Sequence, residues 1–304
     1  MGTPEFAIES LGKILSSSHQ IEAVVTAPDR PAGRGKKLKS SAVKEFALSN
    51  NIKILQPLNL KDSTFINDLK TINADLFVVV AFRMLPEIVW SMPKLGTINL
   101  HASLLPNYRG AAPINWAIIN GEKTTGVSTF FIEKEIDTGE IIQNKTVQID
   151  DLDNVGTLHN KLMSQGASLL LNTINDLENN NIQAYKQEDN KLLKIAPKIN
   201  KLTGKIDWSK NNTQINNLIR GLSPHPGAWT HIMIDEKKLI LKIFSANPLS
   251  SKLNSGEIKI INNELHIGCS FGSLNLAEIQ LEGKKRMPAK EFIKGARITN
   301  SKCL

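Results

Sequence analysis

Short apolar runs alternate with amphipathic stretches over the first 180 residues, and this alternation constrains the fold more than any other feature. Apolar runs of strand length occupy residues 21–26, 52–55, 75–81, 96–100, 125–132 and 140–147. Between them, apolar residues recur with helical spacing at residues 4–15, 42–49, 63–72 and 155–177. Strands that alternate with helices predict an α/β fold with a parallel, doubly wound sheet. Residues 77–81 are apolar throughout, as expected of a strand covered on both faces.

Polar side chains mark the end of the strand predicted at residues 96–100. Asn99 and His101 stand at alternate positions, so both project from the same face of the sheet. A proline-stopped loop, SLLP at residues 103–106, and the pair Arg109-Gly110 follow, and a helix is expected to begin near Pro113. Open α/β sheets bind their ligands at such strand ends.

Asn99, His101 and the downstream Asp137 have the chemistry that acyl transfer requires. An amide and an imidazole can hydrogen-bond a developing oxyanion, and a carboxylate can orient the imidazole or take a proton from an attacking nucleophile. The sequence has no GxSxG motif, and Cys269 and Cys303 lie far from this segment. The same three residues could instead close hydrogen bonds in a loop and cap a turn, and spacing alone leaves both interpretations open.

Several motifs in order carry a resemblance to a known family. These are MGTPEFA at the N-terminus, PDRPAGRGKKLKSSAVKEFA from Pro28, NLHASLLPNYRGAAP from Asn99, DTG from Asp137 and SPHPGAW from Ser223. The chain resembles the folate-dependent formyltransferases from Met1 to about Arg297. The resemblance implies a Rossmann-like formyltransferase domain followed by a small OB-like β-barrel domain. It also implies that Asn99, His101 and Asp137 are the catalytic residues.

The resemblance assigns further roles. It implies 10-formyltetrahydrofolate as the formyl donor, bound by the loop at residues 103–106 and by an apolar wall at 80–85. The folate-binding residues expected from it are Ser103, Leu104, Leu105, Pro106, Phe82 and Leu85. His225, between two prolines, is expected to shape a turn. His19, His159, His231 and His266 lack metal-ligand spacing, and no phosphate-loop motif is present, so we expect neither a metal nor a nucleotide cofactor.

The resemblance also bears on the start of the chain. A doubly wound unit opens with a strand before its first helix, whereas this chain begins at the turn Met1-Gly2-Thr3-Pro4. In the resembling family a short apolar strand precedes that turn. If the chain is genuinely shortened, a central strand position would be empty, which would leave backbone groups unpaired. An internal methionine taken as the start, which we favour, and a shortened chain both remain open.

Composition is typical of a soluble globular protein. The chain has 304 residues, 41% hydrophobic and 22% charged, which suits two domains better than one. No apolar run approaches the roughly 18 residues of a membrane span, and no signal peptide is visible. Two cysteines without further cysteine-rich spacing favour free thiols in a reducing compartment. We therefore expect a cytoplasmic protein.

Positive charge is concentrated in two regions. Residues 205–304 contain 15 Lys or Arg against 8 Asp or Glu, and residues 29–44 contain 6 against 1. Separated basic regions suit a long polyanion, because phosphate contacts accumulate along a nucleic-acid backbone. A solvated basic face is the alternative for the C-terminal region. In residues 29–44, prolines and glycines predict an irregular loop, and its expected tRNA-binding residues are Arg30, Arg34, Lys36, Lys37 and Lys39.

A polar, lysine-rich stretch predicts the domain boundary. We expect a catalytic domain at residues 1–183, a linker at 184–204 and a C-terminal tRNA-binding domain at 205–304. In the last domain, a helix is predicted at 211–222 and short strands at 228–234, 238–245, 256–261, 264–267 and 273–280. Several short strands separated by turns favour a small barrel.

The function that the resemblance implies is transfer of a formyl group to the α-amino group of methionine esterified to initiator tRNA, and the two basic regions suit such a nucleic-acid substrate. A related enzyme that formylates glycinamide ribonucleotide or an amino sugar nucleotide could use the same three catalytic residues. A non-catalytic tRNA-binding protein could keep the same fold. Neither small substrate accounts for the two basic regions, and the intact set Asn99, His101 and Asp137 argues against the non-catalytic alternative.

Overall fold

A computed structural model describes residues 1–32, 37–188, 192–234, 237–295 and 303. Within it the chain forms two compact units whose segments interleave along the sequence. Unit 1 contains residues 1–110, 125–148 and 159–195, and unit 2 contains 111–124, 149–158 and 196–304. Each unit is described by itself.

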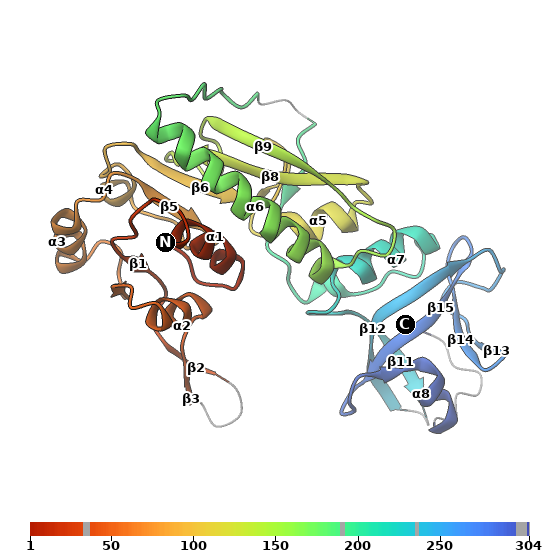
Figure 1. Ribbon diagram of the computed structural model, residues 1–304. Coiled ribbons are helices and arrows are strands. Elements are labelled where there is room, and N and C mark those ends of the chain that lie inside the picture. The colour runs from red at the N-terminus through yellow and green to blue at the C-terminus, as the bar shows by residue number, and fades with distance from the viewer. Residues whose placement is uncertain (33–36, 189–191, 235–236, 296–302, 304) are drawn as a thin grey trace. The chain divides into compact units, whose positions relative to one another are not determined.

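The elements of unit 1 follow the predicted α/β alternation (Figure 1). In chain order they are α1 (Phe6–Leu15), β1 (Val24–Val25), β2 (Arg30–Ala32), β3 (Lys37–Lys39), α2 (Ala42–Ser49), β4 (Ile54–Leu55), α3 (Ser63–Ile72), β5 (Phe77–Val80), α4 (Glu87–Trp90), β6 (Thr97–His101), β7 (Arg109–Gly110), β8 (Thr124–Phe131), β9 (Ile141–Gln148) and most of α6 (Val155–Glu178). Helix starts are specified locally. Ser41 caps α2 by accepting from Lys44 N–H, and Asp62 caps α3 by accepting from Thr64 and Phe65 N–H.

The main sheet of unit 1 has the order β5-β6-β8-β9. β5 and β6 are parallel, with Val80 opposite Leu100, whereas β6 and β8 are antiparallel, with Asn99 opposite Phe130. The expectation of an all-parallel sheet is therefore wrong for this edge. Pairing direction depends on how segments distant in sequence meet, which an apolar run does not reveal. α6 packs on the sheet, where a Cβ on Gly166 would lie 2.9 Å from a Leu100 methyl group.

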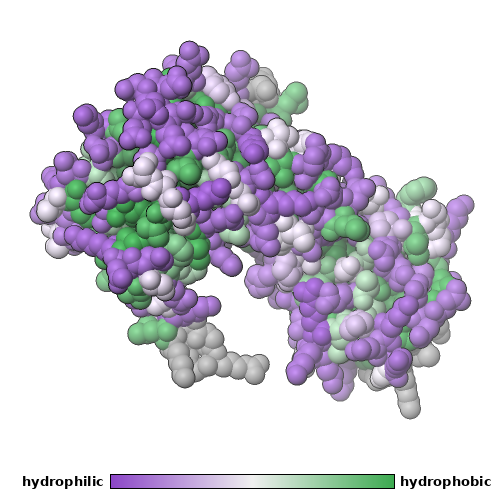
Figure 2. All heavy atoms as spheres, in the orientation of Figure 1, coloured by the Kyte–Doolittle hydropathy of each residue, from purple (hydrophilic) through white to green (hydrophobic). Residues whose placement is uncertain are grey.

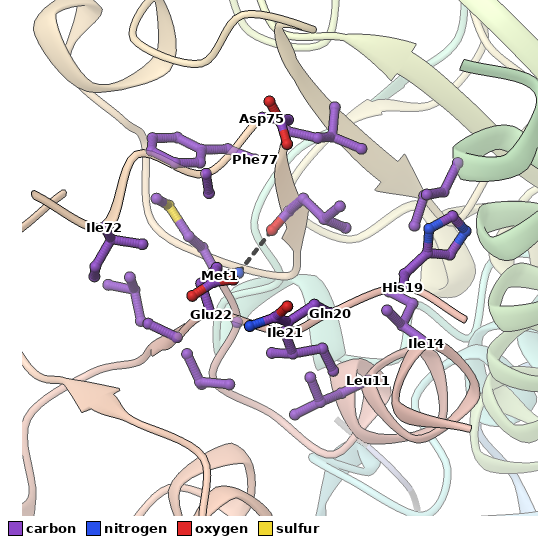
Figure 3. A pocket seen from close by; sticks show the side chains of 18 of the residues that line it. Met1, Leu11, Ile14, His19, Gln20, Ile21, Glu22, Ile72, Asp75 and Phe77 are labelled. Carbon is purple, nitrogen blue, oxygen red and sulfur yellow. Dashed lines mark hydrogen bonds between the residues drawn. The ribbon is translucent and has the colours of Figure 1, made fainter. Parts of the chain in front are cut away.

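The sheet is interrupted between β1 and β5. β1 pairs in parallel with β4 as a separate two-stranded sheet, and the space between β1 and β5 holds only the first two residues. The Met1 amine donates to Val78 O at 2.6 Å, Val80 N–H donates to Met1 O, and Gly2 N–H donates to Val25 O (Figure 3). The pair Met1-Gly2 thus bridges the carboxyl-terminal ends of β1 and β5.

Below Met1 lies a groove of about 490 Å³ that is lined by apolar residues and by polar ones such as His19 and Asp75. Figure 3 shows side chains of Leu11, Ile14, Ile21, Ile72 and Phe77 around it, and Figure 2 shows hydrophobic residues gathered near the N-terminus. The groove runs along β1 and β5.

Unit 2 is built around an antiparallel sheet. Its elements are α5 (Pro113–Ile119), β10 (Ile195–Ala196), a 3₁₀ turn (Leu202–Gly204), α7 (Asn212–Gly221), β11 (Ala228–Ile234), β12 (Lys237–Leu249), β13 (Ile258–Ile261), β14 (Glu264–Gly268), β15 (Ser273–Leu281), β16 (Met287–Pro288) and α8 (Ala289–Gly295). The strand order is β11-β12-β15-β14-β13, with β16 beside β15. α7 begins with a capping box between Asn211 and Gln214.

The sheet of unit 2 curls around its own core rather than closing completely. Among the described residues, β11 and β13 are its ends in the hydrogen-bonded order. The register of β12 against β15 shifts near Ser245, and such irregularities bend a strand. The predicted small barrel is therefore a curled half-barrel. Cys269 and Cys303 are free and buried in this unit, as predicted, and burial raises their thiol pKa values to about 11 and about 12.

In the described part of the chain, no helix has both the length and the apolar character needed to cross a bilayer.

Candidate active site

Strand β6 places the two predicted catalytic side chains at its carboxyl-terminal end, inside the sheet. Asn99 is half-buried between Val79 of β5 and Phe130 of β8, and His101 is the last residue of the strand. The Asn99 Oδ1 atom is buried and has no hydrogen-bond partner in the described part of the chain. A buried, unpaired amide oxygen costs free energy, which a ligand N–H could recover.

His101 is buried and held on three sides. Its Nε2 donates to Tyr108 O at 2.9 Å, since a carbonyl oxygen can only accept. Its Nδ1 lies 3.7 Å from Asp137 Oδ2, and its ring packs edge-on against Phe130 with 6.5 Å between centroids. The imidazole therefore has one orientation, with the carboxylate beside Nδ1.

A strained turn presents the Asp137 carboxylate. Asp137 has a left-handed φ of 57°, and its Oδ2 accepts from Gly110 N–H at 2.9 Å. At Gly139, an added Cβ would lie 1.8 Å from Phe131 O, so only glycine fits. The DTG motif is thus a backbone requirement as well as a source of the carboxylate. The structure brings Asn99 and His101 onto one strand and Asp137 against His101.

Gln187 is a site residue that the sequence did not indicate. Its Nε2 donates to Asp137 O at 2.9 Å and to Gly139 O at 2.7 Å, and its Oε1 accepts from Arg109 Nε and Nη2. One side chain thereby fixes both ends of the DTG turn. Gln187 stands 50 residues after Asp137 in a polar stretch, and no local pattern distinguishes it.

The loop predicted to bind folate is tightly hydrogen-bonded within itself. Ser103 Oγ donates to Asn107 O at 2.7 Å, and Leu105 N–H donates to Ser128 Oγ. Leu105 is buried in a cluster with Phe130 and Ile141. Leu104 and Pro106 are partly buried. Ser103 and Leu105 thus shape the loop from inside, and the folate roles of all four residues remain predictions.

The other predicted folate residues follow β5. Leu85 is buried in the core cluster that contains Val25 and Phe77, whereas Phe82 is partly buried and lines a cavity at the sheet edge. Since β5 and β6 are parallel neighbours, the loop after Val80 lies at the same edge as His101.

The basic segment at residues 29–44 contains regular structure that the sequence did not predict. β2 and β3 pair antiparallel, with Arg30 opposite Lys39 and Pro31 opposite Leu38. The expectation of a wholly irregular loop is wrong at its base, because Pro31 leaves its neighbours extended and an edge pair tolerates proline. Arg30 and Lys39 are exposed. Arg34 and Lys36 lie outside the described residues, as does the side chain of Lys37.

No group of His, Cys, Asp and Glu with the arrangement of a metal site occurs within the described ranges.

Comparison with family models identifies the chain's relatives. A model described as "Formyl transferase" matches residues 1–174, and one described as "Formyl transferase, C-terminal domain" matches residues 198–297. The chain belongs to the formyl transferase family. The roles of Asn99, His101 and Asp137 in catalysis stay predictions.

Curated members of the formyl transferase family resemble this chain over its whole length. "Methionyl-tRNA formyltransferase" of Flavobacterium johnsoniae is 52% identical over 97% of this chain and 94% of its own. The protein of the same name from Bacteroides thetaiotaomicron is 45% identical over 99% of this chain and 95% of its own.

Solved structures of formyl transferases share the fold. WlaRD, described as a sugar 3N-formyl transferase and solved in the presence of dTDP and 5-N-formyl-THF, is 25% identical, with a TM-score of 0.67 over 93% of this chain and 97% of its own. An N-formyltransferase from Helicobacter canadensis is 22% identical with a TM-score of 0.65, over 90% of this chain and 96% of its own, which supports the fold alone.

Proposed function

We propose that this protein transfers a formyl group from 10-formyltetrahydrofolate to the α-amino group of methionyl initiator tRNA. The observation that carries the proposal is the placement of His101 Nδ1 3.7 Å from Asp137 Oδ2, beside Asn99 on the same strand. The names of relatives that are 44–52% identical over nearly the whole chain support the tRNA substrate. The formyl-folate with which WlaRD was solved supports the donor.

In the proposed reaction the methionyl amine attacks the formyl carbon. A C–N bond forms to the α-nitrogen and the bond from the formyl carbon to N10 of the folate breaks. Asn99 can donate through Nδ2 to the oxyanion that develops on the formyl oxygen, and His101 can donate through Nδ1 when that nitrogen carries a proton, because its Nε2–H is bound to Tyr108 O. The unpaired Asn99 Oδ1 can accept an N–H of the attacking amine, which would orient its lone pair.

Proton transfer is assigned to Asp137. The amine loses a proton as it attacks, and N10 gains one as it leaves. Asp137 accepts the amine's proton directly or through water, while Gly110 N–H and Gln187 hold its carboxylate and backbone in place. Burial of His101 and Asp137 strengthens these interactions, because less water screens them.

We also propose the division of labour within the chain. Residues 1–183 would form the catalytic domain, 184–204 a linker and 205–304 a tRNA-binding domain. Ser103 to Pro106, Phe82 and Leu85 would line the folate site. The basic residues Arg30, Arg34, Lys36, Lys37 and Lys39 would contact the acceptor stem of the tRNA, in support of which stands the charge of residues 29–44.

The relatives do not favour the alternative substrates. The sugar formyl transferase WlaRD shares only 25% identity, against 52% for the tRNA formyltransferase of Flavobacterium johnsoniae. The deciding experiment offers 10-formyltetrahydrofolate with charged initiator tRNA, glycinamide ribonucleotide or an amino sugar nucleotide. Formylation of the charged tRNA alone supports the proposal, and preferential formylation of either small substrate contradicts it.

A further inference from the structure

A second cavity, of about 340 Å³, lies at the carboxyl edge of the β strands in unit 1. Its walls come from three places: the turn after Gly2, the segments flanking the β2–β3 hairpin, and the loop after β5. The side chains that matter for its chemistry are three cations and three hydroxyls, here called the basic pocket: Arg30, Lys39, Arg83, Thr3, Ser40 and Ser41. The volume falls within the range of small-ligand sites.

The cations of the basic pocket lack counter-ions. Among the described residues, none of Arg30, Lys39 and Arg83 forms an ion pair. The nearest carboxylate in the sequence, Asp29, is already paired with Lys44 at 2.6 Å and accepts from Gln56. No Asp or Glu lines the cavity. Like charges are therefore gathered at one place without compensation.

Arg83 is fixed in the wall of the pocket by neutral groups. Its Nη1 donates to Leu58 O at 3.0 Å, its Nη2 donates to Pro57 O, and its Nε is buried without a partner in the described part of the chain. Burial, and then the charge of Arg30, lower the pKa of the Arg83 guanidinium. A bound anion would relieve both effects.

One helix start adds to the positive potential. Ser41, in the pocket wall, is the N-cap of the eight-residue α2. The first N–H groups of a helix have no intrahelical acceptor and carry partial positive charge. Backbone dipoles, cations and hydroxyls thus converge on one cavity, which is the donor set that a phosphate group requires.

The position of the pocket relates it to the candidate active site. Phe82, which also lines the cavity, follows β5, and His101 ends β6, its parallel neighbour. One wall of the pocket and the candidate active site therefore follow the ends of two adjacent strands. An aminoacyl nucleotide suits this arrangement, with an amine at one end and phosphates a few bonds away.

We infer that the basic pocket binds a backbone phosphate near the 3′ end of the tRNA substrate, an inference that rests on the proposed function. Arg83, Arg30 and Lys39 hold the phosphate oxygens, and Thr3 adds a hydroxyl donor, whereas the Ser40 side chain already hydrogen-bonds Asp29. Arg30 of β2 and Lys39 of β3 thereby bind the 3′ end of the tRNA acceptor strand. The pocket fixes the amine's distance from His101 through the length of the terminal nucleotide.

The test measures direct binding, which requires no turnover. The affinity of the uncharged trinucleotide CCA is compared with that of adenosine, which has no phosphate, for the natural sequence and for Lys39→Gln and Arg83→Gln. Each variant is expected to weaken CCA binding about 10-fold, as for loss of a hydrogen bond to a charged group, and to leave adenosine binding unchanged. The slope of log affinity for CCA against log salt concentration should decrease by the amount that corresponds to about one phosphate contact.

Controls separate the pocket from other effects. Lys61→Gln removes one exposed cation from unit 1 and should change neither ligand's affinity. Arg83→Gln also loses hydrogen bonds to Pro57 and Leu58 and could therefore unfold. In that case the result for Lys39→Gln, at an exposed position, decides the test. Unchanged CCA binding in Lys39→Gln, no CCA binding by the natural sequence, or equal losses for CCA and adenosine would overturn the inference.

Two parallel measurements distinguish this inference from the proposed function. Weaker binding of 5-formyltetrahydrofolate in the variants would assign the pocket to the carboxylates of the folate and would also overturn the inference. Formylation of charged initiator tRNA by the natural sequence tests the proposed function separately. A protein that binds CCA through the pocket but formylates no tRNA would contradict the function and not the pocket.

Discussion

The side-chain amide of Gln187 donates a hydrogen bond of 2.9 Å to the backbone carbonyl of Asp137. It donates a second to Gly139 O at 2.7 Å, so the turn that carries the carboxylate is held from outside by one residue. Asp137 itself has a left-handed backbone, which costs free energy in the absence of such support. Gln187 is therefore a positioning residue for Asp137.

The first prediction concerns Gln187. Gln187→Glu keeps the size of the side chain and can still pair with Arg109, but a carboxylate cannot donate to Asp137 O. We expect kcat to fall about 10-fold or more, because a small displacement of a catalytic group is costly, with little change in KM for charged tRNA. Steady-state kinetics measures this. Equal kcat values for Gln187→Glu and the natural sequence would show that the turn holds its shape without Gln187.

The second prediction concerns the catalytic residues. Asn99→Ala, His101→Ala and Asp137→Ala should each reduce turnover at least about 100-fold, the usual loss for a group that stabilises the transition state. Binding of charged tRNA should be nearly unchanged, since most of its affinity comes from phosphate contacts. Normal turnover in a folded variant would show that the replaced residue has no role in the mechanism.

The third prediction concerns Gly139. Gly139→Ala places a methyl group 1.8 Å from Phe131 O, so the turn must shift. We expect a loss of stability of about 1–3 kcal/mol and a loss of activity. The matched control is Gly12→Ala in α1, where the new methyl meets only the Phe46 ring at 3.7 Å and helix propensity should add about 0.5–1 kcal/mol. Chemical denaturation compares the two, and a neutral Gly139→Ala would contradict the packing argument.

The fourth prediction concerns the N-terminal amine. Burial lowers its pKa from 8.0 to about 5. Between these values the unfolded chain binds a proton that the folded chain does not, so stability is greatest above pH 8 and decreases as the pH falls to 5. The decrease should be about 1.4 kcal/mol per pH unit. Denaturation over this range measures it, with an Nα-acetylated chain as control, in which this contribution must vanish.

The groove below Met1 leads to a related expectation. An apolar segment of about six residues, a common strand length, added before Met1 should pair with β1 and β5 and bury its side chains in the groove. Stability should rise by at least about 2 kcal/mol. A segment of Gly and Ser of the same length serves as the control. Equal melting temperatures for the apolar and the Gly/Ser extensions would show that the groove does not accept a strand.

The fifth prediction concerns the basic residues Arg34, Lys36 and Lys37. Replacing Arg34, Lys36 and Lys37 together by Gln should weaken binding of charged tRNA and flatten its dependence on salt, because fewer counter-ions are released. Folate binding should not change. The slope of log Kd against log salt is the measurement. An unchanged slope would mean that these residues form only a solvated face, and the nucleic-acid contacts would then fall to unit 2.

Much of the fold could be predicted because its determinants are local. α2 and α3 have the predicted bounds, since Ser41 and Asp62 cap them and the apolar spacing is clear. β11 also has its predicted bounds. The order of elements follows from the alternation of apolar runs. The direction of β8 and the pairing of β2 with β3 could not be predicted, because they depend on contacts between segments whose sequences carry no sign of them.

The sequence by itself predicted which groups the candidate site contains. Asn99 and His101 share a face because strand side chains alternate. Only the tertiary structure decided what surrounds these groups. It brings Gln187 to Asp137 across 50 residues, leaves Asn99 Oδ1 unpaired, and gathers Arg83 with Arg30 and Lys39. Hydrogen bonds, burial and charge interactions depend on distances in space. Spacing along the chain predicts those distances only for residues in the same helix or strand.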